Sequence, residues 1–253
     1  MPTKTSLKEE TTKEEIVSAA GEDIVVGTTP YAMVPQTQAG VSGDFDLTDI
    51  TFPKLQLVHG IGPLSDEFAK GGIVLDGETL VSDGDQEVEI TVVKIAKMFE
   101  ENIPFETGEI PRIVATKAEL LELGGDTEYG PRDPKTGKSE PPSWKPIADA
   151  LVCIKDPTGE DDTNFPYEMF DNERKEGGNY AFAMWRIKNS AYRRAAVPIF
   201  TAATMYYREG LRTGSFKLTT EKAKFGQNTV VVPKIVKGTR HSEDFVAWLG
   251  EFA

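Results

Sequence analysis

The chain has 253 residues, 39% of them hydrophobic, which suffices for one large domain or two small ones with a buried core. Its formal net charge of −13 argues against a surface that is basic everywhere, so the distribution of charge matters more than the total. No apolar run approaches the roughly 18 residues of a membrane span, and the first residues lack the apolar segment of a secretory signal, so we expect a cytoplasmic protein.

The first 43 residues are predicted to form a flexible acidic arm outside the folded core. The stretch Lys8–Glu15 is almost entirely polar, and the residues after it show no regular apolar period. Ser6 and Glu9 have the spacing of a capping box, which leaves a short helix open as the alternative.

Alternating apolar and polar residues predict a mainly β core over residues 44–237. Val88–Lys97 is the longest such stretch, and Asp76-Gly77 predicts the turn of a hairpin over residues 71–80. The Gly-, Pro- and charge-rich residues 118–146 predict a long inserted loop that begins with a short helix. The remaining strands are expected at residues 52–58, 149–155, 180–188, 215–220 and 229–236.

One longer helix is expected among the strands. Apolar residues recur at helical spacing over Ala191–Arg208, with Ser190 as the expected N-cap and Gly210 after the end. Pro198 predicts a kink or a division within this helix. The only cysteine, Cys153, lies in an apolar strand, so we expect a buried thiol and no disulfide within the chain.

Basic residues are concentrated between Trp185 and Lys237. This segment contains eleven cations and two acids. It therefore carries a net charge of +9, and the rest of the chain carries −22. Seven aromatic residues are interleaved with the cations: Trp185, Tyr192, Phe200, Tyr206, Tyr207, Phe216 and Phe225. Cations neutralise phosphates and exposed rings stack on bases, so the pattern favours single-stranded nucleic acid. The alternative is that the rings belong to the core and the cations to an ordinary solvated face.

Residues 238–253 combine acids with large apolar side chains directly after this basic segment. We predict an acidic and aromatic tail that covers the basic surface when nucleic acid is absent or recruits replication partners. The residues expected to act in it are Glu243, Asp244, Phe245, Trp248 and Phe252. A short terminal helix that packs Phe245, Trp248 and Leu249 on the core is the alternative.

The run from Trp185 to Ala196 (WRIKNSAYRRAA), followed by Lys217–Thr220 and Val232-Pro233, resembles phage single-stranded DNA-binding proteins with an OB-fold, including the T7 type. The β-rich core, the basic helix and hairpin, and the acidic tail are similar to their layout over residues 45–253. The tail departs from the T7 pattern, because it has only three acids and ends in Ala253 after Phe252.

This resemblance implies an OB-like Greek-key barrel with one or two helices and long loops, whose curved face guides the strand. It implies that phosphates are contacted by Arg186, Lys188, Arg193, Arg194, Lys217, Lys222 and Lys224. It also implies that bases stack on the rings of Trp185, Tyr192, Tyr207 and Phe216.

Catalytic interpretations rank lower. The two histidines, His59 and His241, and the single cysteine lack zinc-ligand spacing, and no phosphate-binding loop or nucleophile motif occurs. Carboxylates at Asp83, Asp85, Glu87 and Glu89 and at Glu160, Asp161 and Asp162, with Glu173 and Lys175, are the kinds of residue that a magnesium nuclease uses. Their loose spacing in so acidic a chain favours solvated loops. We therefore expect no catalytic step, no metal and no cofactor.

We predict sequence-tolerant single-stranded DNA binding in phage DNA replication or recombination, in the host cytoplasm. The expected partners are single-stranded DNA, with RNA left open, and replication or recombination proteins that contact the tail. A homo-oligomer is left open, and no membrane is expected. The alternative is a phage structural or protein–protein interaction module that does not bind nucleic acid. Salt distinguishes the two functions, because phosphate binding weakens steeply as salt rises.

Overall fold

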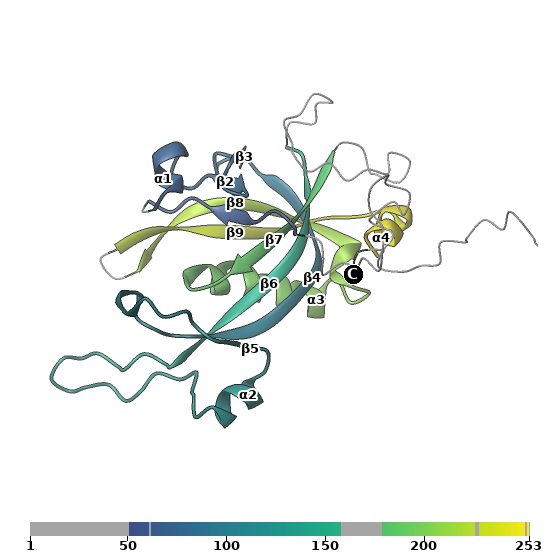
Figure 1. Ribbon diagram of the computed structural model, residues 1–253. Coiled ribbons are helices and arrows are strands. Elements are labelled where there is room, and N and C mark those ends of the chain that lie inside the picture. Colours follow the sequence, from purple (N-terminus) through teal and green to yellow (C-terminus); the bar gives the residue numbers. More distant parts are fainter. Residues whose placement is uncertain (1–50, 61, 158–178, 226–227, 251, 253) are drawn as a thin grey trace, which may run out of the picture.

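The computed structural model of the chain describes residues 51–60, 62–157, 179–225, 228–250 and 252 (Figure 1). The predicted N-terminal arm lies outside the described residues, as do Glu160–Asp162, Glu173 and Lys175 of the candidate nuclease site. Within the described ranges, no helix is long and apolar enough to cross a membrane.

Six strands form an antiparallel sheet around one long central pair. β4 (Val88–Glu101) pairs with β6 (Trp144–Lys155) along nearly its whole length, with one bulge at Val93. The strand order is β7-β6-β4-β8-β9, and the two-residue β5 pairs with the far end of β4. The other bounds are Ile113–Val114 for β5, Tyr180–Ile187 for β7, Gly214–Phe225 for β8 and Asn228–Arg240 for β9.

A smaller sheet of three strands, in the order β1-β2-β3, lies against the large one (Figure 1). Its strands are β1 (Leu55–Leu57), β2 (Ile73–Leu75) and β3 (Thr79–Ser82), with the short helix α1 (Leu64–Glu67) between β1 and β2. The predicted hairpin turn is confirmed: Asp76 and Gly77 both have positive φ, and the Glu78 amide donates to the Leu75 carbonyl across them. Lys54 bridges to Met184 of β7, and the Thr220 amide of β8 donates to the Gly84 carbonyl.

The connection from β7 to β8 crosses the large sheet as a helix. A π-helical turn, η3 (Tyr192–Ala196), leads directly into α3 (Val197–Met205), and the wider turn accommodates Pro198, which has no N–H to donate. Helical backbone already begins at Ser190, after Asn189 with φ 55°, so the prediction of Ser190 as N-cap is wrong. The main core lies between this helix and the two sheets, and it includes Ile90, Val152, Ile187, Ile199 and Phe216.

The helix α4 (Glu243–Gly250) covers the opposite face of the large sheet. Phe245, Trp248, Leu249 and Phe252 are buried there against strand residues that include Phe182 and Cys153. The Phe182 ring centroid lies 4.4 Å from that of Phe252 and 5.7 Å from that of Trp248. The prediction of an exposed aromatic tail is therefore wrong, and the alternative of a docked terminal helix is confirmed. Burial also raises the pKa of the Cys153 thiol, which is buried as expected.

The prediction of a mainly β fold with few helices is confirmed, although the sheets do not form a closed barrel. The expected helix within the inserted loop is present as α2 (Lys117–Glu122). That loop ends earlier than predicted, because β6 begins at Trp144, which pairs with Glu101 and is buried.

We predict that Trp248→Ala lowers the free energy of unfolding by about 3–5 kcal/mol, because it leaves a cavity under α4. Urea denaturation followed by circular dichroism measures the change. Ala247→Gln, an exposed position on the same helix, is the matched control and should change stability by less than about 0.5 kcal/mol. Equal stability of the two variants would show that α4 adds nothing to the core.

Candidate nucleic-acid interface

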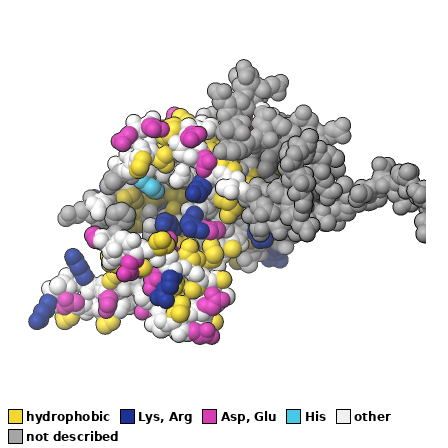
Figure 2. Space-filling model, viewed as in Figure 1, with side chains coloured by type: hydrophobic (Ala, Val, Ile, Leu, Met, Phe, Trp, Pro, Cys, Tyr) yellow, Lys and Arg dark blue, Asp and Glu magenta, His cyan; other side chains and the backbone are white. Residues whose placement is uncertain are grey.

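A groove of about 1220 Å³ opens between the small sheet, the end of β7 and the first residues of β9. In Figure 2 it is the hollow in the face turned to the reader, with apolar side chains on its floor and Lys and Arg side chains beside it. Four cations line it, Lys54, Lys70, Arg186 and Lys188, whereas Asp149 is the acid among its lining residues. We call it the basic groove.

The floor of the basic groove is mainly aliphatic: Trp185 also belongs to the lining, but it is buried and exposes almost no ring surface. Leu57 of β1, Met184 of β7 and Val230 and Val231 of β9 contribute to its lining. Three strands that are distant in sequence therefore supply one apolar surface. Such a surface, rimmed by a few charged groups, is the usual form of a ligand-binding site in proteins.

The four cations of the groove differ in their partners. Arg186 donates from Nε and Nη2 to the two carboxylate oxygens of Asp149, at 2.8 and 2.6 Å, and this contact raises the pKa of the guanidinium. Lys188 Nζ lies 3.3 Å from Glu100 Oε1. Lys54 and Lys70 form no ion pair with any described residue, so their charges are the most available to an anionic ligand.

Two of the predicted phosphate-binding cations, Arg186 and Lys188, line the groove. Lys222 and Lys224 lie beside it on β8: they are exposed and stand directly opposite Val231 and Thr229, which belong to the lining. Directly paired residues of antiparallel strands share one face of the sheet, so these two lysines extend the basic surface along the hairpin.

The structure does not bring the other three predicted cations to the groove. Arg193 is exposed on η3, and Arg194 Nη1 lies 3.3 Å from Glu221 Oε1. Lys217 Nζ donates to Glu87 Oε2 at 2.6 Å, and this hydrogen bond raises the pKa of the lysine. Exposed pairs of this kind contribute little to stability.

Three of the four predicted stacking rings are buried, so the expectation that bases stack on them is wrong. The exposed fractions of Trp185, Tyr207 and Phe216 are 2%, 2% and 1%. Trp185 pairs with Ala150 and Phe216 with Ile90, which places both rings on the core side of the sheet. Tyr207 packs edge-on against Phe216, and burial raises the pKa of its hydroxyl, which donates to the Ser215 carbonyl. The fourth ring, Tyr192, is partly buried against the same core.

The residues of the predicted partner-binding tail are also divided by the fold. Glu243 and Asp244 are exposed in the first turn of α4, where acids favour a helix. Phe245, Trp248 and Phe252 are buried, so their rings are not available to a partner protein. The aromatic residues of this segment thus belong to the folded core.

Lys54, His59 and Lys70 were not identified from the sequence as site residues. They lie outside the basic segment, and no local surplus of charge surrounds them. The small sheet brings them to β7, through the bridge from Lys54 to Met184. The available signal is the alternation of Lys54 and Gln56 with buried or partly buried leucines, which predicts that both side chains point away from the core.

Residues 102–143 form a projection from the far end of the β4–β6 pair, which we call the acidic lobe (Figure 1). It contains η2 (Phe105–Thr107), β5 and α2. Eight acids and five cations lie in it, a net charge of −3. Large apolar side chains are nevertheless exposed on it: Ile110, Ile113, Leu121, Leu123 and Tyr129.

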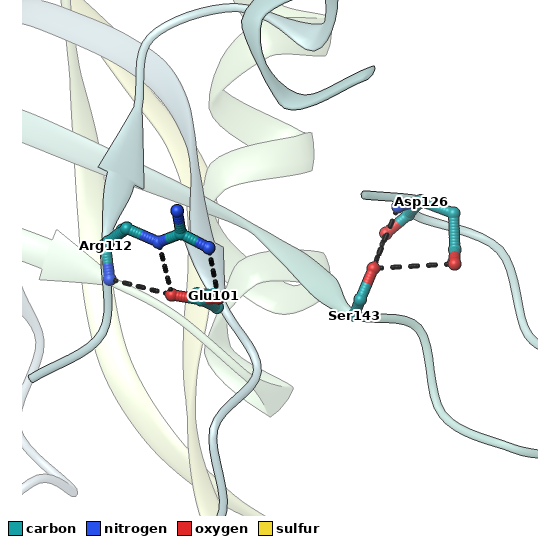
Figure 3. A network of polar contacts seen from close by, with 4 residues as sticks. All are labelled: Glu101, Arg112, Asp126 and Ser143. Atoms are coloured by element: carbon teal, nitrogen blue, oxygen red, sulfur yellow. Dashed lines mark hydrogen bonds and ion pairs between the residues drawn. The ribbon is translucent and has the colours of Figure 1, made fainter. Parts of the chain in front are cut away.

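Contacts at its base hold the acidic lobe in place (Figure 3). Arg112 donates from Nε and Nη2 to Glu101, at 2.9 and 2.7 Å, and this contact lowers the pKa of the Glu101 carboxyl. Ser143 Oγ accepts from the Asp126 amide at 2.8 Å, which ties the end of the lobe to the segment that follows α2. Leu120 of α2 is fully buried with Phe99 and Trp144 in a small separate core.

We predict that Leu120→Ala opens the acidic lobe locally without unfolding the rest of the chain. Removing a fully buried leucine costs about 2–5 kcal/mol, and the lobe has only a small core to absorb that loss. Hydrogen exchange should become faster over residues 113–123 and stay unchanged in β6 and β7. Lys117→Ala, at an exposed position on the same helix, is the control and should leave exchange unaltered.

Comparison with known proteins does not assign a function. No family model, no curated protein and no solved structure matches the chain.

Proposed function

We propose that the protein binds single-stranded DNA without strict sequence preference, in phage DNA replication or recombination, and that the basic groove holds the strand. The observation that carries the proposal is a groove lined by four cations over an aliphatic floor, in a chain whose net charge is −13. A positive concavity on an acidic protein concentrates a polyanion at one place and repels it elsewhere.

The size and the floor of the groove favour a strand over a small ligand. Pockets for small molecules typically measure about 300–1,000 Å³, whereas this groove exceeds that range and is continued by Lys222 and Lys224 along the hairpin. Unpaired bases can contact the apolar side chains of Leu57, Met184 and Val230, but a duplex keeps its bases stacked inside. Contacts to apolar groups and phosphates alone carry little sequence information.

The roles of the groove cations follow from their surroundings. Lys54 and Lys70 have no described ion-pair partner and would neutralise phosphates directly. Arg186 is oriented by Asp149 and Lys188 lies near Glu100, so a phosphate would share or displace those carboxylates. We therefore expect Lys54 and Lys70 to contribute more affinity per charge than Arg186 and Lys188.

Fluorescence anisotropy of a labelled oligo-dT, compared with duplex DNA from low to physiological salt, tests the proposal. We expect preferential binding of the single strand, with log K falling against log salt by about 0.7 per neutralised phosphate. The double variant Lys54→Glu, Lys70→Glu should weaken binding roughly tenfold or more and reduce the salt slope.

Lys94→Glu with Lys155→Glu is the matched control for this experiment, because it changes the total charge equally and neither lysine lines the groove. Its affinity should change far less than that of the groove variant. Absence of binding at low salt would refute the proposal. Equal losses in the two variants would show that total charge, rather than the groove, determines affinity.

A protein–protein interaction module that does not bind nucleic acid is the second candidate. The observation that favours it is the exposure of Leu121, Leu123 and Tyr129 on the acidic lobe, since a soluble monomer rarely exposes neighbouring large apolar side chains. The two candidates differ in the anisotropy experiment, because this one predicts no binding of oligo-dT at any salt concentration.

A further inference from the structure

The basic groove and the acidic lobe have complementary surfaces. The groove combines a mainly aliphatic floor with Lys54, Lys70, Arg186 and Lys188, whereas the lobe combines exposed aliphatic side chains with a net charge of −3. Contact between the two surfaces would bury the apolar side chains of both and pair their opposite charges. Complementary charge also selects one partner and its orientation over others.

The two surfaces are neighbours on one side of the molecule. Lys188 of the groove lies 3.3 Å from Glu100, and Glu100 pairs with Ile113 at the base of the lobe. Figures 1 and 2 agree, because β5 and α2 lie below the hollow in the same view. Neighbouring complementary surfaces suit a two-fold dimer, in which each copy gives its lobe and receives the other's.

The acidic lobe is held in shape before any partner binds. The Glu101–Arg112 pair, the Asp126–Ser143 contacts and the buried Leu120 fix β5 and α2 to the end of β4. Leu121 and Leu123 are therefore presented by a structured element, which lowers the entropy lost on association.

We infer that the chain forms a two-fold homodimer in which the acidic lobe of each copy, through Ile110, Leu121 and Leu123, occupies the basic groove of the other. The lobe then competes with single-stranded DNA for the groove, so DNA binding separates the dimer. This regulatory part rests on the proposed function, whereas the dimer itself does not.

Sedimentation velocity without DNA, over a range of protein concentrations at low salt, tests the dimer. We expect a monomer–dimer equilibrium that shifts toward monomer as salt rises, because screening weakens the charge contacts. Leu121→Asp with Leu123→Asp should raise the dimer dissociation constant at least tenfold. Met205→Asp is the matched control, because Met205 is 60% exposed on α3 outside both surfaces, and it should leave the constant unchanged.

Charge exchange tests the pairing of the two surfaces. Lys54→Glu with Lys70→Glu, and separately Glu109→Lys with Glu122→Lys, should each remain monomeric, and their mixture should form a one-to-one heterodimer. Glu119 is left intact, because its carboxylate accepts from the Ala115 amide at the start of α2. Rescue by mixing excludes misfolding as the cause of the two losses.

Each remaining outcome decides the proposal. A chain that stays monomeric at all concentrations overturns it, as does a dimer that neither pair of charge reversals weakens. If only the lobe variant loses the dimer and mixing does not restore it, the lobe contacts a surface other than the groove. That result also overturns the proposal. Addition of unlabelled oligo-dT should convert dimer to monomer; a dimer that is present but unaffected by DNA removes only the regulatory part.

Discussion

The long pairing of β4 with β6 is the constraint on which the rest of the structure depends. It runs from Ile90 opposite Ile154 to Glu101 opposite Trp144, and it extends well past the main core. At one end, both faces of the pair are covered, by α3 and the small sheet on one side and by α4 on the other. At the other end, the same two strands support the acidic lobe. A single ladder of backbone hydrogen bonds therefore joins the two surfaces to which we assign function.

Both faces of the large sheet are covered, and this determines which side chains stay exposed and can bind a ligand. α4 uses Phe245 and Trp248 to fill one face, and the main core uses Trp185 and Phe216 on the other. Burying large rings is the strongest apolar contribution available to such a layered fold, because each removes roughly 150–250 Å² from water. The consequence is that the exposed floor of the groove is aliphatic, and that cations rather than stacking rings dominate the candidate interface.

The fold separates the acids of the lobe from the cations of the groove. Acids and exposed leucines share the lobe, whereas Lys54 and Lys70 come to the groove from a separate small sheet. A protein with a strongly negative total charge repels DNA except where cations gather, and the same field favours contact between its own basic and acidic surfaces. Competition between lobe and strand for one groove would make DNA access depend on protein concentration and on salt.

The sequence by itself determined the local elements: the period-two strands, the Asp76-Gly77 turn, the short helix at residue 117 and the buried Cys153 are all visible in it. It also determined that positive charge concentrates after Trp185. Only the tertiary structure decided which aromatic side chains are exposed, because strand alternation shows that faces differ but not which face packs against α3 or α4. It also brought Lys54 and Lys70 to Arg186, since contacts between strands so far apart in sequence depend on sheet pairing rather than on local pattern.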